Sequence, residues 1–335
     1  MKKVTFIITI YDNLNNLSDC IDSIESQSGI EKEIYLLSNK YSRKDIENIF
    51  FEKKNVHYIC AKKGETIGSL RNSSLVLASG DYICFIDSGD YIIGGSVESI
   101  IEKLSSSGFK FAVGQTLTYD LLKNKCYEED NIHFINGKVN YMKNIYEDKD
   151  LSNKIYKTDY IREKGVKFAD TNNYNDLVFL AKLYSNAKTA LDYTLNYNLK
   201  RVIINDDSLC SDKELIEIKI KDALYILNSI NIKYVDGEFS YQSNKALLDR
   251  LLNLSRNYVL NNYIDIDLFK EMQSSLSYIK LDYCELSERE YIILDSLKKG
   301  KFNSFVDSII KESKSSKKRT FASNVFLKLF KRNSQ

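Results

Sequence analysis

Residues Gly68–Tyr91 read GSLRNSSLVLASGDYICFIDSGDY. The first half has apolar residues at helical spacing, and Gly80 predicts the end of that helix because glycine tolerates a left-handed C-terminal conformation. The next apolar run is short and typical of a strand buried on both faces. The turn Asp87–Asp90 follows this strand at its carboxyl end, the edge at which open α/β sheets bind ligands.

Two carboxylates that end a buried strand raise the free energy unless a cation meets them, although an ordinary polar turn is the alternative interpretation. The segment resembles the motif of family 2 glycosyltransferases, which have the GT-A fold. In that family Arg-Asn, an apolar helix, Gly-Glu/Asp-Tyr-Ile and Phe-Leu-Asp-Ser-Asp-Asp follow one another. Here Arg71 begins the series, and Gly89 departs from it by replacing the last residue of the family's metal-binding Asp-x-Asp.

The order of strand and helix patterns predicts an α/β fold. Apolar strand patterns at 4–10, 33–37 and 56–60 alternate with helix patterns, which favours a doubly wound, mostly parallel sheet. The resemblance covers about residues 1–210, so we expect a GT-A nucleotide-sugar-binding and catalytic domain there, followed by a helical appendage at 211–312.

The resemblance also implies where the donor binds. Thr9 and Tyr11 occupy positions that contact the nucleotide base, and Asn39 stands where the family has an Asp that accepts from uracil N3–H. An Asn side chain can accept or donate, so uridine is allowed but not enforced, and an ordinary turn residue remains the alternative.

The diphosphate is expected near Arg71, because a guanidinium near a helix N-terminus and behind glycines suits an anionic group. A surface arginine is the alternative. The resemblance extends the expected donor-binding set to Gly68, Asp87, Ser88 and Arg201.

The same resemblance implies a hard divalent cation, Mg²⁺ or Mn²⁺, which suits oxygen ligands. Asp87 and Asp90 are the expected ligands. Because Gly89 replaces a carboxylate, either Asp90 reaches the metal, or metal binding is weak and Arg71 acts with Lys200 and Arg201 to neutralise the diphosphate.

A second motif begins at Asn175. Asn-Asp-Leu-Val-Phe resembles the family's Glu-Asp-x-x-Phe motif, whose Asp is the catalytic base, and this implies that role for Asp176. The apolar pattern places Asp176 in the first turn of a helix, where a carboxylate is favoured, and a helix-capping Asp is the alternative.

These residues together suggest an inverting glycosyltransferase. The expected donor is a nucleotide-diphosphate sugar, UDP-linked by resemblance, and the expected acceptor is a hydroxyl of a cell-surface glycan, teichoic acid, lipid-linked or protein molecule. The alternative is a degenerate, non-catalytic GT-A module that binds an active transferase. His57 and His133 are the only histidines and form no metal-spaced cluster, so a His-based triad is excluded.

Charge is unevenly distributed along the chain. The net charge is +2, yet residues 313–335 carry seven basic residues and no acid, which leaves 48 − 7 = 41 basic against 46 acidic residues elsewhere. This acidic body argues against nucleic-acid binding. The six cysteines show neither metal spacing nor a disulfide framework, so we expect a cytoplasmic protein. No apolar run reaches the ~20 residues that a membrane span needs.

The last two segments carry separate expectations. The appendage 211–312 is interpreted as a packing or dimerisation module, with an acceptor-binding lid as the alternative. Residues 314–332 pattern as a basic amphipathic helix, which is typical of a peripheral anchor on the anionic inner face of a membrane. A tail that docks on the acidic body is the alternative.

Overall fold

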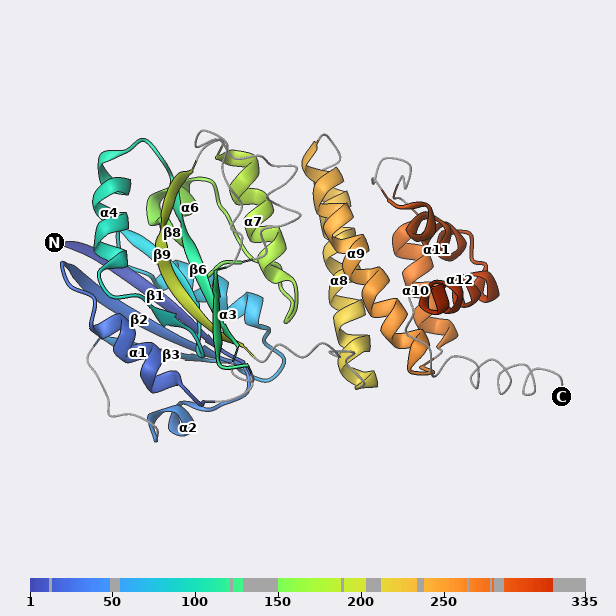
Figure 1. Ribbon diagram of the computed structural model, residues 1–335, viewed down its shortest axis with the longest axis horizontal. Helices are drawn as coiled ribbons and strands as arrows, with labels where there is room; N and C mark the ends of the chain where they lie inside the picture. The colour runs from blue at the N-terminus through green and yellow to red at the C-terminus, as the bar shows by residue number, and fades with distance from the viewer. Residues whose placement is uncertain are drawn as a thin grey trace. The chain divides into compact units, whose positions relative to one another are not determined.

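The computed structural model describes the chain apart from residues 12–13, 49–54, 121–122, 129–149, 188–189, 203–211, 234–237, 264, 278, 280–285 and 316–335. The chain divides into two compact units, Met1–Asp206 and Asp207–Gln335 (Figure 1). The first is an α/β unit and the second is helical.

In the described residues, nine strands of the first unit form one sheet. They are β1 Lys2–Ile10, β2 Ile30–Ser38, β3 Val56–Cys60, β4 Tyr82–Asp87, β5 Tyr91–Ile92, β6 Phe111–Asp120, β7 Lys125–Glu128, β8 Lys154–Lys157 and β9 Leu191–Val202. The order is β3-β2-β1-β4-β8-β6-β9-β5, with β7 beside β6. The predicted α/β class is therefore confirmed.

Only part of this sheet is parallel. Strands β1 to β4 pair in parallel, as expected, and so do β6 and β9. The pairs β4–β8, β6–β8, β6–β7 and β5–β9 are antiparallel. The sheet is thus mixed, because the later strand β8 inserts antiparallel between β4 and β6.

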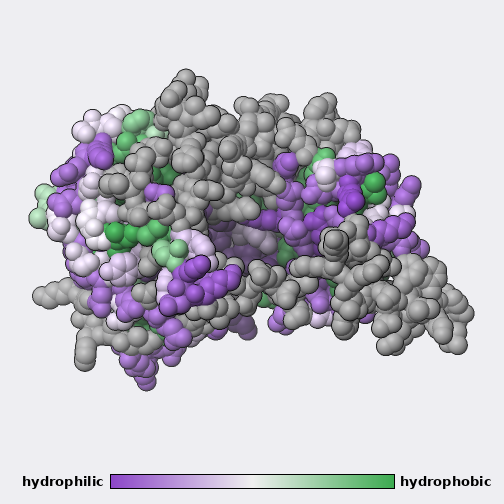
Figure 2. Space-filling view, viewed as in Figure 1, coloured by the Kyte–Doolittle hydropathy of each residue, from purple (hydrophilic) through white to green (hydrophobic). Residues whose placement is uncertain are grey.

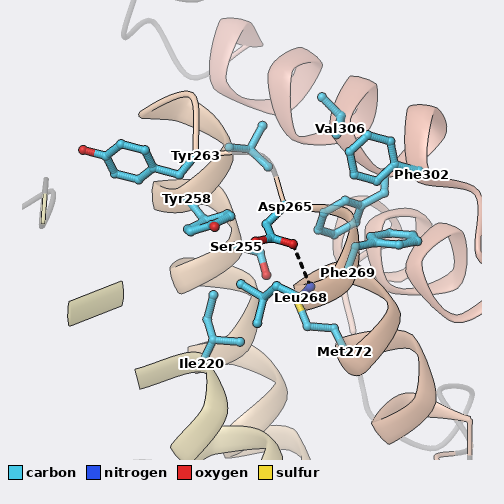
Figure 3. A pocket seen from close by; sticks show the side chains of 12 residues that line it. Ile220, Ser255, Tyr258, Tyr263, Asp265, Leu268, Phe269, Met272, Phe302 and Val306 are labelled. Atoms are coloured by element: carbon cyan, nitrogen blue, oxygen red, sulfur yellow. Dashed lines mark hydrogen bonds between the residues drawn. The ribbon is translucent and has the colours of Figure 1, made fainter. Parts of the chain in front are cut away.

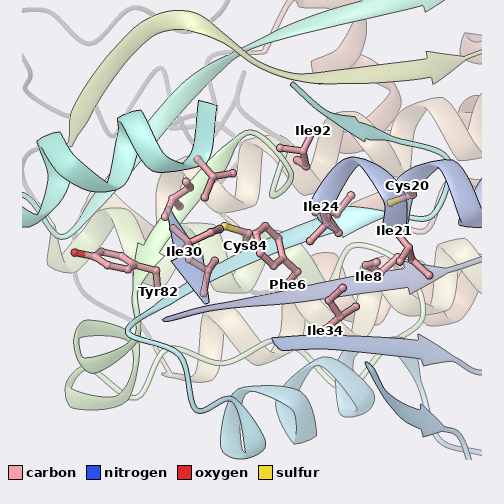
Figure 4. Packing of buried hydrophobic residues seen from close by; sticks show 14 of the residues in the cluster. Phe6, Ile8, Cys20, Ile21, Ile24, Ile30, Ile34, Tyr82, Cys84 and Ile92 are labelled. Carbon is pink, nitrogen blue, oxygen red and sulfur yellow. The ribbon is translucent and has the colours of Figure 1, made fainter. Parts of the chain in front are cut away.

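Helices cover both faces of the sheet. They are α1 Leu17–Glu25, α2 Arg43–Glu47, α3 Ile67–Leu77, α4 Ser96–Ser106, α6 Thr158–Glu163 and α7 Asn175–Asn186. On one face, Phe6 and Ile8 of β1 share a buried cluster with Ile24 of α1 and residues of α4 (Figure 4). Because strand side chains alternate, the other face presents residues such as Phe85, whose ring meets Phe179 of α7 with centroids 5.5 Å apart.

The turn from α3 to β4 differs from the sequence-based expectation. The helix ends at Leu77, before Gly80. A Cβ at Gly80 would lie 2.7 Å from the backbone nitrogen of Thr5, and the Gly80 N–H donates to the Thr5 hydroxyl (2.9 Å). This glycine therefore allows a close approach to β1 and does not supply a left-handed helix terminus.

The second unit contains α8 Lys213–Lys233, α9 Glu238–Leu260, α10 Ile266–Leu276, α11 Glu288–Lys298 and α12 Phe302–Ser315. Arg256 of α9 makes a forked ion pair with Glu312 of α12 (2.6 and 2.8 Å). A mostly apolar cavity of about 20 Å³ lies near Tyr258 and Phe269 (Figure 3). That volume holds about one water molecule, so it cannot take a sugar or a nucleotide.

Where Figure 2 shows described residues, hydrophobic side chains form small patches between hydrophilic ones. Among the helices described, none combines the length and the apolarity needed to cross a bilayer. The expected basic anchor, from residue 316 onward, lies outside the described residues.

Candidate active site

The tips of the central parallel strands bring the first candidate residues together. Thr9 of β1 is the register partner of Asp87 of β4, and its carbonyl accepts from the Ser88 N–H (3.0 Å). Ile10 is the partner of Ser38 at the end of β2, so Tyr11 and Asn39 leave neighbouring strands side by side. The structure therefore places the predicted residues Thr9, Tyr11, Asn39, Asp87 and Ser88 along one edge of the sheet.

Arg71 of α3 is buried and contacts this edge. The residue is 5% exposed. Its guanidinium donates to the Thr9 hydroxyl (3.2 and 3.3 Å), the Tyr11 hydroxyl (2.8 Å) and the Asn175 side-chain oxygen (2.8 Å). It also lies 4.0 Å from the Asp87 carboxylate. The expected diphosphate ligand is thus a buried connector of β1, β4 and the start of α7.

The Asp87 carboxylate lies in a charged environment. Its side chain keeps 51% of its surface accessible, yet desolvation by the surrounding protein raises its pKa. Arg71 opposes this increase, whereas the carboxylates of Asp150 and Asp176 add to it. Asp87 therefore belongs to one charged cluster with Arg71, Asp150 and Asp176.

Asp176 lies in the first turn of α7, as expected, and is half-buried. Its carboxylate accepts from the Leu177 N–H (3.0 Å). The Tyr11 side chain is partly exposed, but its hydroxyl points inward to Arg71. Burial raises the pKa of this hydroxyl, and the charges of Asp87 and Asp176 raise it further. Asp176 therefore belongs to the same electrostatic environment as the strand tips.

Asp150 is a charged neighbour of Asp87 that is not among the residues predicted from the sequence. This carboxylate accepts from the Ser152 N–H (2.8 Å) and hydroxyl (2.7 Å) and forms an ion pair with Lys200 of β9. Burial alone would raise its pKa, but Lys200 and Lys154 outweigh that effect and lower it. No motif marks Asp150, because its ion-pair partner Lys200 is distant in the sequence and only the fold brings the two together.

Gly68 and Arg201 are the remaining residues of the predicted donor-binding set. The Gly68 N–H donates to the Thr171 carbonyl (3.0 Å), and a Cβ there would lie 1.8 Å from the Ala169 oxygen. Gly68 therefore allows α3 to pack against the segment before α7. Arg201 lies on β9, but its side chain is outside the described residues.

The expected metal ligands, Asp87 and Asp90, lie at the two ends of the turn after β4. Asp90 is 7% exposed, and its N–H donates to the Asp87 carbonyl (2.9 Å). Within the described part of the chain, no group of three or more His, Cys, Asp or Glu side chains is placed to hold a metal ion. The assignment of Asp87 and Asp90 as metal ligands therefore stays a prediction.

Comparisons with known proteins agree with this architecture. The "Crystal structure of S. aureus TarS 1-349 in complex with UDP" superposes with a TM-score of 0.65 at 15% identity, over 94% of this chain and 91% of that one. "Glycosyltransferase GlyA" of Streptococcus pneumoniae is 22% identical over 65% of this chain and 31% of its own length. "Teichoic acid poly(glycerol phosphate) polymerase" of Staphylococcus epidermidis is 21% identical over 54% and 26%.

The chain thus spans about a third or less of the length of these two curated relatives. Residues 5–167 match the family model described as "Glycosyl transferase family 2". Over this region the chain belongs to the family 2 glycosyltransferases, and it has their GT-A fold.

Proposed function

We propose that this chain is an inverting glycosyltransferase that moves a sugar from a UDP-linked donor to a hydroxyl of a cell-surface polymer of the teichoic acid type. The observation that carries the proposal is that Arg71 joins Tyr11 and Asp87, at the carboxyl edge of the parallel strands, to the first turn of α7, which carries Asp176. UDP in the TarS complex and the teichoic acid polymerase among the relatives support the donor and the acceptor class.

In the proposed reaction, the acceptor hydroxyl attacks the anomeric carbon from the side opposite the diphosphate. A new carbon–oxygen bond forms, the bond to the diphosphate oxygen breaks with its electron pair, and Asp176 takes the hydroxyl proton. Asp87 is proposed to orient the donor sugar or ribose, and Lys200, beside Asp150, to offset diphosphate charge. No step is assigned to a metal ion.

The test is transfer by the full chain with UDP-glucose and UDP-N-acetylglucosamine as donors and poly(ribitol phosphate) or poly(glycerol phosphate) as acceptor. Asp176→Asn should lower turnover by about 10²–10⁴-fold, because the amide cannot take the proton, while UDP affinity stays near that of the wild type. Asp159→Asn is the matched control, since Asp159 is an exposed acid in the first turn of α6. Near wild-type turnover by the Asp176 variant would exclude it as the base.

Gly89 favours a second candidate, a GT-A module that binds nucleotide sugars without catalysis. A Cβ at Gly89 would meet nothing within 4 Å, so the position has space for the carboxylate that the family carries but does not supply it. Such a module would bind UDP but release no sugar from any donor, and Asp176→Asn would change nothing measurable.

A further inference from the structure

Asn39 has a hydrogen-bond partner far away in the sequence. Its side-chain nitrogen donates to the Asn172 side-chain oxygen (2.9 Å). Asn39 leaves the tip of β2, and Asn172 lies in the segment that leads to Asp176. Both residues are exposed, beside the strand edge that carries Tyr11. This contact therefore links the β2 tip to the segment before α7.

A backbone group fixes the orientation of Asn172. The Ile67 N–H, in the first turn of α3, donates to the same Asn172 oxygen (3.1 Å). A backbone N–H can only donate, so the atom it meets must be the oxygen of the amide. Asn172 therefore presents an acceptor toward Asn39, and its amide cannot be reversed without losing this bond.

The orientation of Asn39 follows. Facing an acceptor, Asn39 must present its nitrogen to Asn172, and a reversed amide would set two oxygens against each other. The Asn39 oxygen then points away from Asn172. An asparagine side chain can in general donate or accept. Here the Asn39 nitrogen faces Asn172, so the atom that Asn39 offers to a ligand on its other side is the oxygen, an acceptor.

We propose that Asn172 is a positioning residue that holds the Asn39 oxygen toward the nucleotide base, so that the site prefers uracil to cytosine. The proposal rests on the proposed function, which places a nucleoside diphosphate at these strand tips. Uracil carries an N3–H that donates to such an oxygen, whereas cytosine N3 is an acceptor and would oppose it. A site that leaves polar groups unpaired with the wrong ligand discriminates against that ligand.

The experiment measures UDP and CDP affinity by titration calorimetry on the full chain. The wild type should prefer UDP by roughly tenfold, the range of one hydrogen bond and its mismatch. In Asn172→Ala this preference should fall to about twofold or less, because the Asn39 amide can turn. Asn172→Asp should keep the wild-type preference, since a carboxylate can only accept from Ile67 and Asn39.

Asp170→Ala is the matched control. Asp170 accepts from the Thr66 hydroxyl (2.5 Å), so its loss removes one contact between the same segment and the N-terminus of α3 and leaves Asn39 untouched. This variant should keep the wild-type UDP preference.

Three results would overturn the inference alone: an unchanged preference in Asn172→Ala, a loss in Asn172→Asp as large as in the alanine variant, or the same loss in the control. A wild type that binds neither nucleotide overturns the proposed function as well.

Discussion

Arg71 has two possible uses for its guanidinium, and the structure favours one. A free arginine near a helix N-terminus is suited to an anionic diphosphate, but here its donors meet Thr9, Tyr11 and Asn175. Its positive charge also lies beside the half-exposed Asp87 carboxylate. We therefore interpret Arg71 as the residue that fixes the position of the strand edge with Thr9 and Tyr11 relative to the start of α7.

Replacing Arg71 by Lys should lower the free energy of unfolding by about 2–3 kcal/mol, because an ammonium group cannot reproduce the forked geometry and leaves polar partners unpaired. Urea unfolding followed by circular dichroism measures this change. Arg43→Lys is the control, since Arg43 is largely exposed and pairs with Glu47 one turn away. The control should change stability by about 0.5 kcal/mol or less. Equal effects of the two substitutions would contradict the assigned role.

Gly89→Asp tests whether this turn can regain a metal-binding carboxylate. The added side chain meets open space, so the folded protein should keep its stability within about 0.5 kcal/mol. UDP affinity should become dependent on Mn²⁺, because a second carboxylate would share the cation with the diphosphate. Titration of UDP with and without Mn²⁺ measures the effect. Gly94→Asp, at a position equally free of neighbours, should leave the metal dependence unchanged, and an unchanged Gly89 variant would contradict the prediction.

Among the elements, Glu33 joins β2 to its neighbours. The residue is 7% exposed. Its carboxylate accepts from the Thr5 hydroxyl of β1 (2.6 Å) and from the N–H (2.8 Å) and hydroxyl (2.6 Å) of Ser79. Lys3 lies 3.5 Å away. One buried carboxylate thus connects β1, β2 and the turn that leads into β4.

This connection predicts a pH dependence of stability. Burial alone would raise the pKa of Glu33, but the hydrogen bonds from Ser79 and Thr5 and the charge of Lys3 outweigh it and lower the pKa. A lowered folded-state pKa means that the stabilisation is fully present above the unfolded-state pKa, about 4.3, and is lost as the pH falls through the folded-state value.

Glu33→Gln should therefore cost about 1–3 kcal/mol of unfolding free energy at pH 7. The gap between the variant and the wild type should shrink as the pH falls below about 4. Urea unfolding at pH 7 and at pH 3.5 (roughly one unit below the reference value) measures both quantities. Glu31→Gln, at an exposed position of the same strand, should cost little at pH 7. A gap that stays constant with pH would show that the charge is not responsible.

For the whole molecule, the basic tail is the feature with the clearest test. The residues after 315 carry six of the seven basic side chains found at 313–335, whereas the rest of the chain has more acidic than basic residues. Each basic residue near an anionic leaflet contributes roughly 1 kcal/mol, so the tail should bind anionic vesicles at low salt and release them at high salt.

Co-sedimentation with phosphatidylglycerol vesicles should separate the full chain from a chain truncated after Ser315, the last residue of α12. Neutral vesicles are the control and should retain neither protein. Equal sedimentation of both chains with anionic vesicles, or none by the full chain, would exclude the tail as an anchor.

Local patterns determined the α/β class, the central strands and helices, and the positions of Asp87 and Asp176 in their elements. These features depend on short-range periodicity and on which residues end a strand or begin a helix, so they can be read from neighbouring residues. The family motifs added the expected activity because they lie within those same short segments.

Tertiary structure decided the contacts that join distant segments. It placed β8 between β4 and β6, made the sheet mixed, and turned Arg71 inward to Asn175. It also paired Lys200 with Asp150 and oriented Asn39 through Asn172. A side chain's chemistry sets what it can donate or accept, but its partners are chosen by packing between segments far apart in the sequence, which no local pattern contains.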